Sequence, residues 1–97
     1  MVRRILLMKL TDQGIKDIKN APQRIEQGTK ASEKMGGKLI GFYAVTGEYD
    51  YIAIGEFPSE EIGMAFVMGL SAPGNVRTTT ITAFTKEDFA GMVKKLP

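Results

Sequence analysis

The pattern of apolar and polar positions predicts an alternation of strands and helices. In residues 2–10, Ile5 and Leu7 fall on one alternating face of an extended chain. Leu6 and Met8 fall on the other face. A strand that is buried on both sides has this pattern, so we expect residues 2–10 to form a central strand of a sheet.

The following segment has helical spacing, interrupted by Pro22. Proline is tolerated best in the first turn of a helix, and Asn20 is a good N-cap just before it. We therefore expect a short helical turn at about residues 12–19 and a main helix from about residue 21. The glycines at 36–37 end that helix, because glycine adopts the left-handed conformation at little cost.

Two strands joined by a hairpin come next. Alternating apolar positions predict strands over residues 38–46 and 49–57, joined at Gly47-Glu48. Pro58 ends the second of these strands. The hairpin makes the two strands neighbours in one sheet.

A helix, a strand and a short last helix complete the pattern. Ser59 can cap a helix over about residues 60–70, where apolar residues recur at helical spacing. The threonine-rich segment 75–84 predicts a strand. Thr85 and Asp88 resemble a capping box, which opens a short C-terminal helix.

The order β-α-β-β-α-β, followed by a short helix, predicts a ferredoxin-like α+β fold. We expect one four-stranded antiparallel sheet with strand order 4-1-3-2. The whole chain, residues 1–97, is expected to form one domain, because so few residues rarely hold two independent cores.

Both faces of the predicted sheet are apolar, although the two long helices cover only one of them. A large exposed apolar patch is uncommon on a monomeric protein. We therefore expect a homodimer or higher oligomer that stacks two sheets, as in a dimeric α/β barrel. The alternative is that the last helix folds across the open face, which it is too short to cover completely.

The positions of the strand ends decide which candidate residues can meet. We expect the first and third strands to run parallel, which places the hairpin at the end of the sheet that holds Arg3, Arg4 and Phe84. Arg77 then lies at the opposite end, together with both helix N-termini. Since a strand of eight residues spans about 26 Å, we expect no direct pair between Asp50 and Arg77.

Composition narrows the chemistry that is available. The chain has 13 Lys+Arg, 11 Asp+Glu, no Cys and no His. This excludes disulfides, thiolate nucleophiles, iron–sulfur clusters, histidine bases and most transition-metal sites. We therefore expect no metal and no cofactor, and a site built from Tyr, Arg, Thr and carboxylates.

The charges are unevenly distributed along the chain. Residues 1–40 hold nine basic and four acidic side chains, whereas residues 41–75 hold five acidic and no basic ones. The basic residues lie at helical spacings beside acidic ones, which is typical of solvated helix faces rather than of nucleic-acid binding.

No apolar run approaches the ~20 residues that span a bilayer, and the N-terminus lacks the features of a signal peptide. We expect a cytoplasmic protein that binds neither nucleic acid nor membrane.

At the hairpin, Glu48, Tyr49 and Asp50 offer two carboxyl groups and a phenol, which can perform acid–base work when burial shifts a pKa. The favoured interpretation is structural. Turn chemistry calls for these residue types, with Asp50 capping backbone amides or pairing with Arg3 or Arg4.

At the other end, helix N-termini attract anions, and Arg77 with Lys9 or Lys38 could complete a site near Thr11 for a small carboxylate or phosphate. The favoured interpretation here is an ion pair of Arg77 with Glu56 or with a neighbouring carboxylate, across the sheet or across the dimer. Tyr43 and Tyr51 could line a cavity between stacked sheets. The candidate ligand-binding residues are therefore Tyr43, Tyr49, Asp50, Arg77 and Thr11.

The run Gly47-Glu48-Tyr49-Asp50 resembles the G-x-Y-D signature of the GYD domain family. Supporting features follow in order along the chain: Leu10-Thr11 with Gly14, Gly36-Gly37, Phe42-Tyr43, Gly74 to Thr78, and Ala83-Phe84. The resemblance implies a prokaryotic, ferredoxin-like protein of the dimeric α/β-barrel type, with no established activity. The wider superfamily holds cofactor-independent monooxygenases, haem-degrading proteins and small-molecule sensors, so its breadth indicates no single function.

We expect a small homo-oligomeric domain that binds a small molecule in a sheet or interface cavity. One alternative is a cofactor-independent oxygenase or isomerase that uses Tyr43, Asp50 or Arg77, although the absence of histidine weakens it. The other alternative is a purely structural interaction module.

Overall fold

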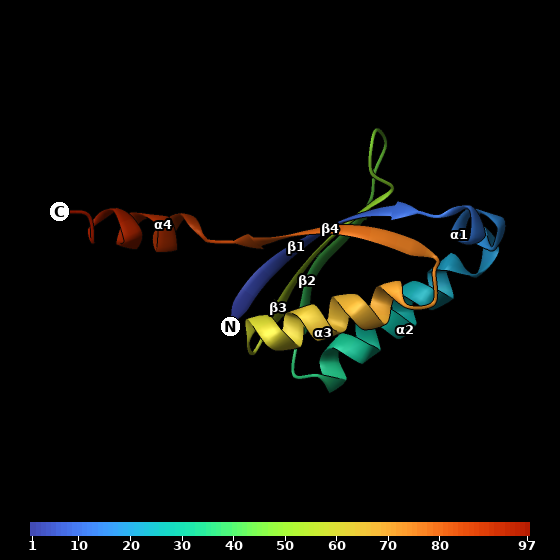
Figure 1. Ribbon diagram of the computed structural model, residues 1–97, viewed down its shortest axis with the longest axis horizontal. Helices are drawn as coiled ribbons and strands as arrows, with labels where there is room; N and C mark the ends of the chain where they lie inside the picture. Colours follow the sequence, from blue (N-terminus) through green and yellow to red (C-terminus); the bar gives the residue numbers. More distant parts are fainter.

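The computed structural model describes all residues 1–97 and has the predicted order of elements (Figure 1). The strands are β1 (Val2–Leu10), β2 (Lys38–Ala44), β3 (Tyr51–Phe57) and β4 (Val76–Ala83). The helices are α1 (Asp12–Lys16), α2 (Ala21–Lys34), α3 (Glu60–Ser71) and α4 (Lys86–Val93), with a 3-10 turn η1 (Ile18–Asn20).

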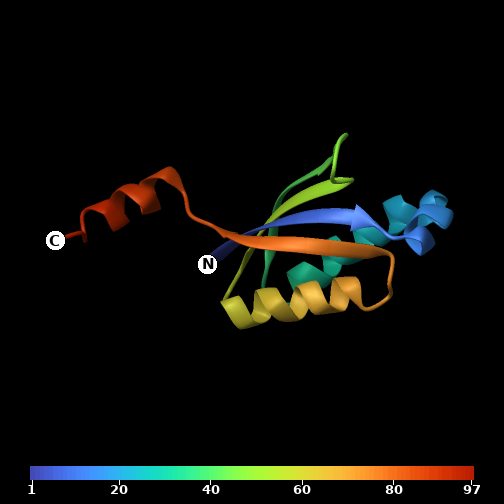
Figure 2. The same cartoon turned by 45° about the horizontal axis from the view of Figure 1, so that its top comes forward.

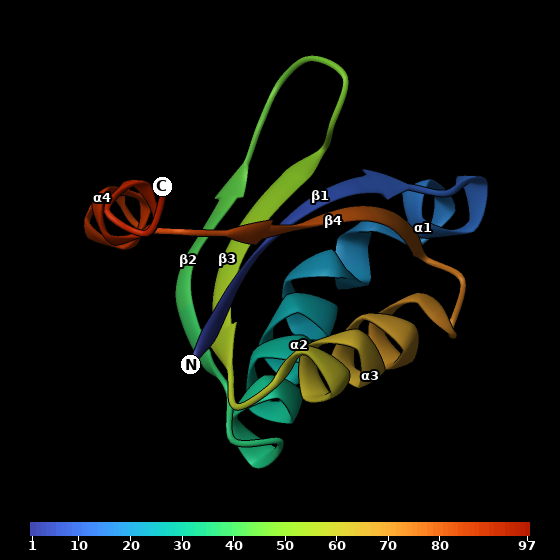
Figure 3. The ribbon, with the colours of Figure 1, turned by 60° about the vertical axis from the view of Figure 1, so that its left-hand side comes forward.

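The four strands form one sheet in the order β2-β3-β1-β4, and every neighbouring pair is antiparallel. This is the predicted order, read from the other edge. Helices α2 and α3 lie on one face of the sheet, and no helix covers the opposite face (Figure 3). The predicted ferredoxin-like α+β fold is confirmed.

The expectation that the first and third strands run parallel is wrong. In the antiparallel pair of β1 and β3, Val2 lies opposite Phe57 and Met8 opposite Tyr51. The crossover through α2 returns the chain so that β2 points the same way as β1, and the hairpin then reverses β3. The hairpin therefore lies beside the C-terminal end of β1, away from Arg3 and Arg4.

Local chemistry sets most element ends as predicted. Ser59 caps α3 through a hydrogen bond from the Ile62 N–H to its hydroxyl oxygen at 3.2 Å. Gly36 takes φ +82° just after α2, where a side chain would be strained. Asn20 is the exception, because its side chain makes no cap and donates instead to the Asp17 carboxylate at 2.6 Å.

The hairpin is longer than predicted. Strand β2 ends at Ala44 and β3 begins at Tyr51, so residues 45–50 form a loop that projects from the sheet (Figure 3). The Val45 N–H donates to the carbonyl of Asp50, and the Asp50 N–H donates to the carbonyl of Met8, both at 2.9 Å. The Val45–Asp50 bond continues the contact between β2 and β3 by one position, and the Asp50–Met8 bond ties the base of the loop to β1.

Successive side chains of each strand alternate between the two faces of the sheet. Leu6, Met8 and Ala53 face the helices and form the buried core cluster. Only ten of the 97 residues are buried, so the core between the helices and the sheet is small.

The other face carries apolar side chains that no element covers. Ile5 lies between Ile54 on β3 and Ile81 on β4, and Leu7 lies opposite Ile52. We call this surface the open face; its apolar residues are Ile5, Leu7, Tyr43, Ile52, Ile54 and Ile81.

Helix α4 stands apart from the rest of the fold (Figure 2). After β4, the chain leaves the sheet at the end where β1 begins and continues away from it. Helix α4 therefore does not fold across the open face of its own chain. No helix in the structure combines the length and the apolar character that crossing a membrane requires.

Candidate functional site

The structure brings the five predicted site residues to one end of the sheet, where β1 ends. They are Tyr43, Tyr49, Asp50, Arg77 and Thr11. Arg77 lies opposite Lys9 on β1, and the Asp50 carboxylate contacts the backbone of Leu10. The expectation that Asp50 and Arg77 lie at opposite ends of the sheet is therefore wrong, although the structure forms no salt bridge between them.

The two helix N-termini that were expected at one end of the sheet lie at opposite ends. Helix α1 begins directly after β1, at the hairpin end. Helix α3 begins after Phe57, which pairs with Val2 at the opposite end. The proposed anion site between two helix N-termini and Arg77 therefore does not assemble.

Asp50 has a structural role at the hairpin. Its Oδ2 atom accepts a hydrogen bond from the Leu10 N–H at 2.8 Å. Arg3 and Arg4 pair instead with Glu56 at 3.1 Å and Glu60 at 2.7 Å. Of the structural interpretations offered for Asp50, capping of a backbone amide is the one that the structure shows.

Thr11 holds the junction between β1, α1 and the turn before β4. Its hydroxyl oxygen accepts from the Gly14 N–H at 3.1 Å and donates to the carbonyl of Gly74. Its N–H donates to the carbonyl of Asn75 at 3.0 Å. These bonds engage the polar groups of Thr11 within the fold.

The remaining three candidates are less tied to the fold. Lys9 lies 5.4 Å from the ring centroid of Tyr49, a cation–π distance. Tyr43 is 60% exposed on the open face, and Arg77 is exposed on the same side. The predicted pair of Arg77 with Glu56 is not formed, because Glu56 pairs with Arg3.

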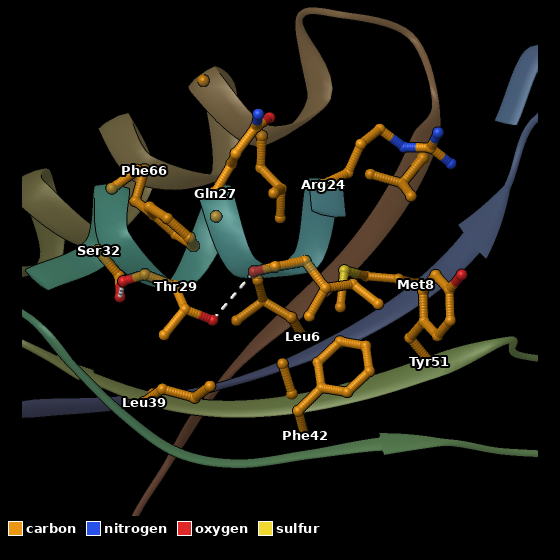
Figure 4. Close-up of a pocket in the computed structure, with 18 of the residues that line it drawn as sticks. Leu6, Met8, Arg24, Gln27, Thr29, Ser32, Leu39, Phe42, Tyr51 and Phe66 are labelled. Carbon is orange, nitrogen blue, oxygen red and sulfur yellow. Dashed lines mark hydrogen bonds between the residues drawn. The ribbon is translucent and has the colours of Figure 1, made fainter. Parts of the chain in front are cut away.

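An apolar cavity lies on the side of the sheet opposite to the open face, between the strands β1, β2 and β3 and the helices α2 and α3 (Figure 4). Its volume is about 520 Å³. The sheet side is lined by Leu6, Met8, Leu39, Phe42, Tyr51 and Ala53, and the helix side includes Ile25, Gly28, Phe66, Gly69 and Leu70. None of the five predicted residues lines this cavity.

The two tyrosines that were expected to share a cavity are separated by the sheet. Tyr51 lines the cavity on the helix side, where its ring centroid lies 5.2 Å from that of Phe42. Tyr43 points to the open face. The cavity is therefore between the layers of one chain, not between the stacked sheets of two.

Polar side chains around the cavity are largely engaged elsewhere. Ser32 donates to the carbonyl of Thr29 at 2.7 Å, and Thr29 donates to the carbonyl of Ile25 at 3.0 Å. Arg24 pairs with the Asp17 carboxylate at 2.9 Å. No carboxylate lines the cavity, so its contacts with an occupant are mainly apolar.

Apart from Tyr51, sequence reasoning missed the cavity residues because it followed polar side chains. The available signal was the small size of residues on the inward helix faces. Ala21, Gly28 and Ser32 line the cavity from α2, and Ala65 and Gly69 line it from α3. Small residues at these positions leave space above the sheet that larger ones would fill.

Comparison with known proteins identifies relatives over nearly the whole chain. A protein-family model described as "GYD domain" matches residues 5–93. The chain is 29% identical over 91 residues to a protein of Thermus thermophilus named "Glutamine synthetase and cystathionine beta-lyase binding protein". That match covers 93% of this chain and 96% of the relative.

Solved structures share the fold at lower identity. The leucine response regulatory protein of Mycobacterium tuberculosis matches with a TM-score of 0.66 and 19% identity, covering 88% of this chain and 51% of that one. A feast or famine regulatory protein of M. tuberculosis, complexed with L-methionine, matches with a TM-score of 0.67 and 19% identity, covering 89% and 52%. This chain thus spans about half the length of those regulators. A solved structure from T. thermophilus matches with a TM-score of 0.56 and 23% identity, covering 88% of this chain and 95% of that one.

Proposed function

This chain belongs to the GYD domain family, and from that premise we propose that it is a self-associating domain which binds a mostly apolar small molecule between its helices and its sheet. The observation that carries this proposal is the cavity of about 520 Å³. Pockets for small molecules typically measure about 300–1,000 Å³ and are lined mainly by apolar side chains.

The small number of buried residues between the helices and the sheet favours a bound ligand in the cavity. Protein interiors are normally close-packed, with few voids larger than a water molecule. Here the buried cluster holds three residues, and Phe42 and Phe66, which pack against it, are themselves only partly buried. An apolar ligand would supply the van der Waals contacts that these side chains lack.

The chemistry of the lining indicates the ligand class. Thr29, Ser32 and Arg24 already have partners within the chain, whereas the side chains of Gln27 and Lys38, which also line the cavity, have none. Burying an unpaired charge there would be costly. We expect a mostly apolar molecule with one or two polar groups at most.

The test is titration with N-phenyl-1-naphthylamine, a neutral dye that fluoresces in apolar surroundings. The wild-type chain should bind one dye saturably, and the dye should raise the thermal midpoint because it binds the native state. Gly69→Leu places a large side chain in the cavity, where a Cβ at this position meets no atom within 4 Å. It should weaken dye binding at least about tenfold, or 1.4 kcal/mol.

Gly91→Leu is the matched control. It makes the same change in α4, outside the cavity, where a Cβ also meets no atom within 4 Å. Its dye affinity should stay at the wild-type value. Unsaturable binding to the wild type, or equal affinity in a folded Gly69→Leu variant, would overturn the proposed cavity function.

Self-association is supported by the open face. Tyr43 and Ile81 are 60% and 47% exposed, and they lie on the same surface as Ile5, Leu7 and Ile54. Such a patch is rare on monomers and typical of an interface. We propose a homodimer, which sedimentation equilibrium would measure as twice 10.6 kDa. A single 10.6 kDa species at micromolar concentration would contradict it.

A second candidate function is binding of a partner enzyme. The T. thermophilus relative is named as a binding protein for two enzymes, and Met64 and Met68 are exposed on α3 of this chain by 54% and 62%. Flexible methionine side chains suit adaptable protein surfaces. Purified glutamine synthetase should then bind the immobilised chain, and Met64→Ser with Met68→Ser should abolish this binding. Equal binding by both forms would exclude this surface.

A further inference from the structure

Helix α4 and the turn after it carry an apolar stripe that the chain itself leaves exposed. Phe89, Met92, Val93 and Leu96 follow the spacing i, i+3, i+4 and i+7, which places them on one side of a helix. Their exposed fractions are 63%, 38%, 48% and 69%. Phe84, just before α4, is 61% exposed. We call residues 84–96 the C-terminal arm.

The arm extends away from the rest of the domain (Figures 1 and 2). The radius of gyration is 14.7 Å, whereas a compact domain of this length has about 12.5 Å. The longest dimension is 53 Å, against 31 and 18 Å for the other two. Such a shape leaves the apolar stripe without a cover from its own chain.

The arm is nevertheless well formed locally. The Thr85 hydroxyl oxygen accepts from the Asp88 N–H at 3.0 Å, and the Thr85 N–H donates to the Asp88 carboxylate at 3.3 Å. This capping box starts α4 directly beyond β4, without a flexible linker. The fold therefore presents the stripe as a preformed surface.

The open face is the second uncovered surface of the same chain. Four strands of about seven residues form a rectangle of about 19 by 23 Å, or roughly 440 Å². A standard interface buries about 800 Å² on each partner. Protruding side chains make the accessible area larger than that of a flat rectangle, but the open face alone is still small for a stable dimer. The apolar stripe of the arm would enlarge the area that each partner buries.

We propose that the C-terminal arm of one copy packs its apolar stripe against the open face of a second copy, which returns the same contact with its own arm. This inference rests on the self-association proposed above and names the surfaces that make it. Each chain supplies one stripe and one open face, so a two-fold arrangement covers all four surfaces.

Charge complementarity between two copies is confined to the first turn of the arm. The first turn of α4 carries Glu87 and Asp88, whereas the open side of the sheet exposes Lys9 and Arg77. Arg77 forms no salt bridge within its own chain. The arm as a whole carries Lys86, Lys94 and Lys95 against Glu87 and Asp88, so only its first turn is complementary in charge to Arg77.

Substitutions on the stripe test the proposal through the solution mass. Phe89→Asp with Val93→Asp changes two exposed residues, so the domain should still fold, while its dimer affinity should fall at least about a hundredfold. Gly91→Asp introduces the same residue type on the opposite side of α4, in open space, and should remain dimeric. A stripe variant that dimerises like the wild type would overturn the role of the arm.

Cysteine cross-linking locates the contact, because the chain has no cysteine of its own. Met92→Cys on the arm and Ile54→Cys on the open face are made separately, mixed and oxidised. A disulfide-linked mixed dimer is expected. Met68→Cys, on a residue that is 62% exposed on α3, should form no such link with Met92→Cys.

The outcomes separate the two proposals. If the wild-type chain is a monomer in solution, both the proposed self-association and the proposed arm contact are wrong. A wild-type dimer in which Met92→Cys links only to itself, or only to Met68→Cys, keeps self-association and overturns the arm contact. The dye titration tests ligand binding in the cavity independently of the solution mass and of the cross-linking.

Discussion

The carboxylate of Asp50 accepts a hydrogen bond from the backbone N–H of Leu10 at 2.8 Å. Along β3, regular pairing with β1 ends where Met8 lies opposite Tyr51. The Asp50 side chain therefore continues the contact between the strands beyond the last backbone pair. The aspartate of the G-x-Y-D run thus anchors the hairpin to the central strand.

Asp50→Ala should destabilise the domain by about 1–3 kcal/mol, because it leaves a partly buried N–H without an acceptor. Urea unfolding followed by circular dichroism measures the change. Glu48→Ala is the control. Its carboxylate is 72% exposed and contacts Lys9 at 3.4 Å, so the expected loss is below about 0.5 kcal/mol. Equal losses in the two variants would contradict the anchoring role.

Arg4 and Glu60 form an ion pair that joins β1 to the start of α3. Arg4 is 8% exposed, and its Nη1 atom lies 2.7 Å from the Glu60 carboxylate. Glu60 also accepts from the hydroxyl of Thr82 at 3.1 Å. The pair therefore links the helix to β1 and β4.

Glu60→Ala should cost about 1 kcal/mol, because it leaves a buried guanidinium without its anion while the carboxylate itself is partly solvated. Glu61→Ala, at the next position of α3, removes an exposed carboxylate that no salt bridge uses. Thermal unfolding of the two variants should therefore differ. A midpoint for Glu60→Ala equal to that of Glu61→Ala would argue against the link.

Gly14 is required by a close backbone approach. A Cβ at this position would overlap the carbonyl oxygen of Asn75, in the turn that leads into β4. Gly14→Ala should destabilise by about 1–3 kcal/mol despite the better helix propensity of alanine. Gly69→Ala, where a Cβ meets nothing within 4 Å, should instead gain up to about 1 kcal/mol. Chemical denaturation gives both values, and a neutral Gly14→Ala would contradict the predicted overlap.

The sequence predicts a ligand role for Tyr43 and Arg77, which competes with the proposed cavity, and the dye titration distinguishes the two. Both residues lie on the open side of the sheet, away from the lining of the cavity. Tyr43→Phe and Arg77→Ala should therefore leave the affinity for N-phenyl-1-naphthylamine unchanged. A loss comparable to that of Gly69→Leu in either variant would place the dye on the open face instead of in the cavity.

Much of the fold could be predicted because its signals are local. Pro22 near the start of α2, Gly36 after its end and Ser59 at the start of α3 each act through the backbone within a few residues. Strand direction was predicted wrongly, since it depends on how the α2 crossover returns the chain. That error placed Arg77 at the opposite end of the sheet from Asp50.

The candidate site was less accessible to prediction. Asp50 and Thr11 were recognised as polar residues at strand ends, but their partners, Leu10 and Gly74, are 40 and 63 positions away along the chain. Whether a carboxylate is free or engaged depends on such distant backbone groups. The same side chains therefore fit a binding site or an anchor until the fold is known.

The sequence by itself determined the order of elements, the helix caps at Ser59 and Thr85 and a sheet with two apolar faces, because hydrophobic periodicity and capping act over a few neighbouring residues. The tertiary structure decided how far α2 and α3 stand from the sheet, and with it the cavity over Phe42 and Tyr51. It also decided that α4 leaves the domain as an arm. Both features follow from packing between distant segments, and no local pattern specifies that packing.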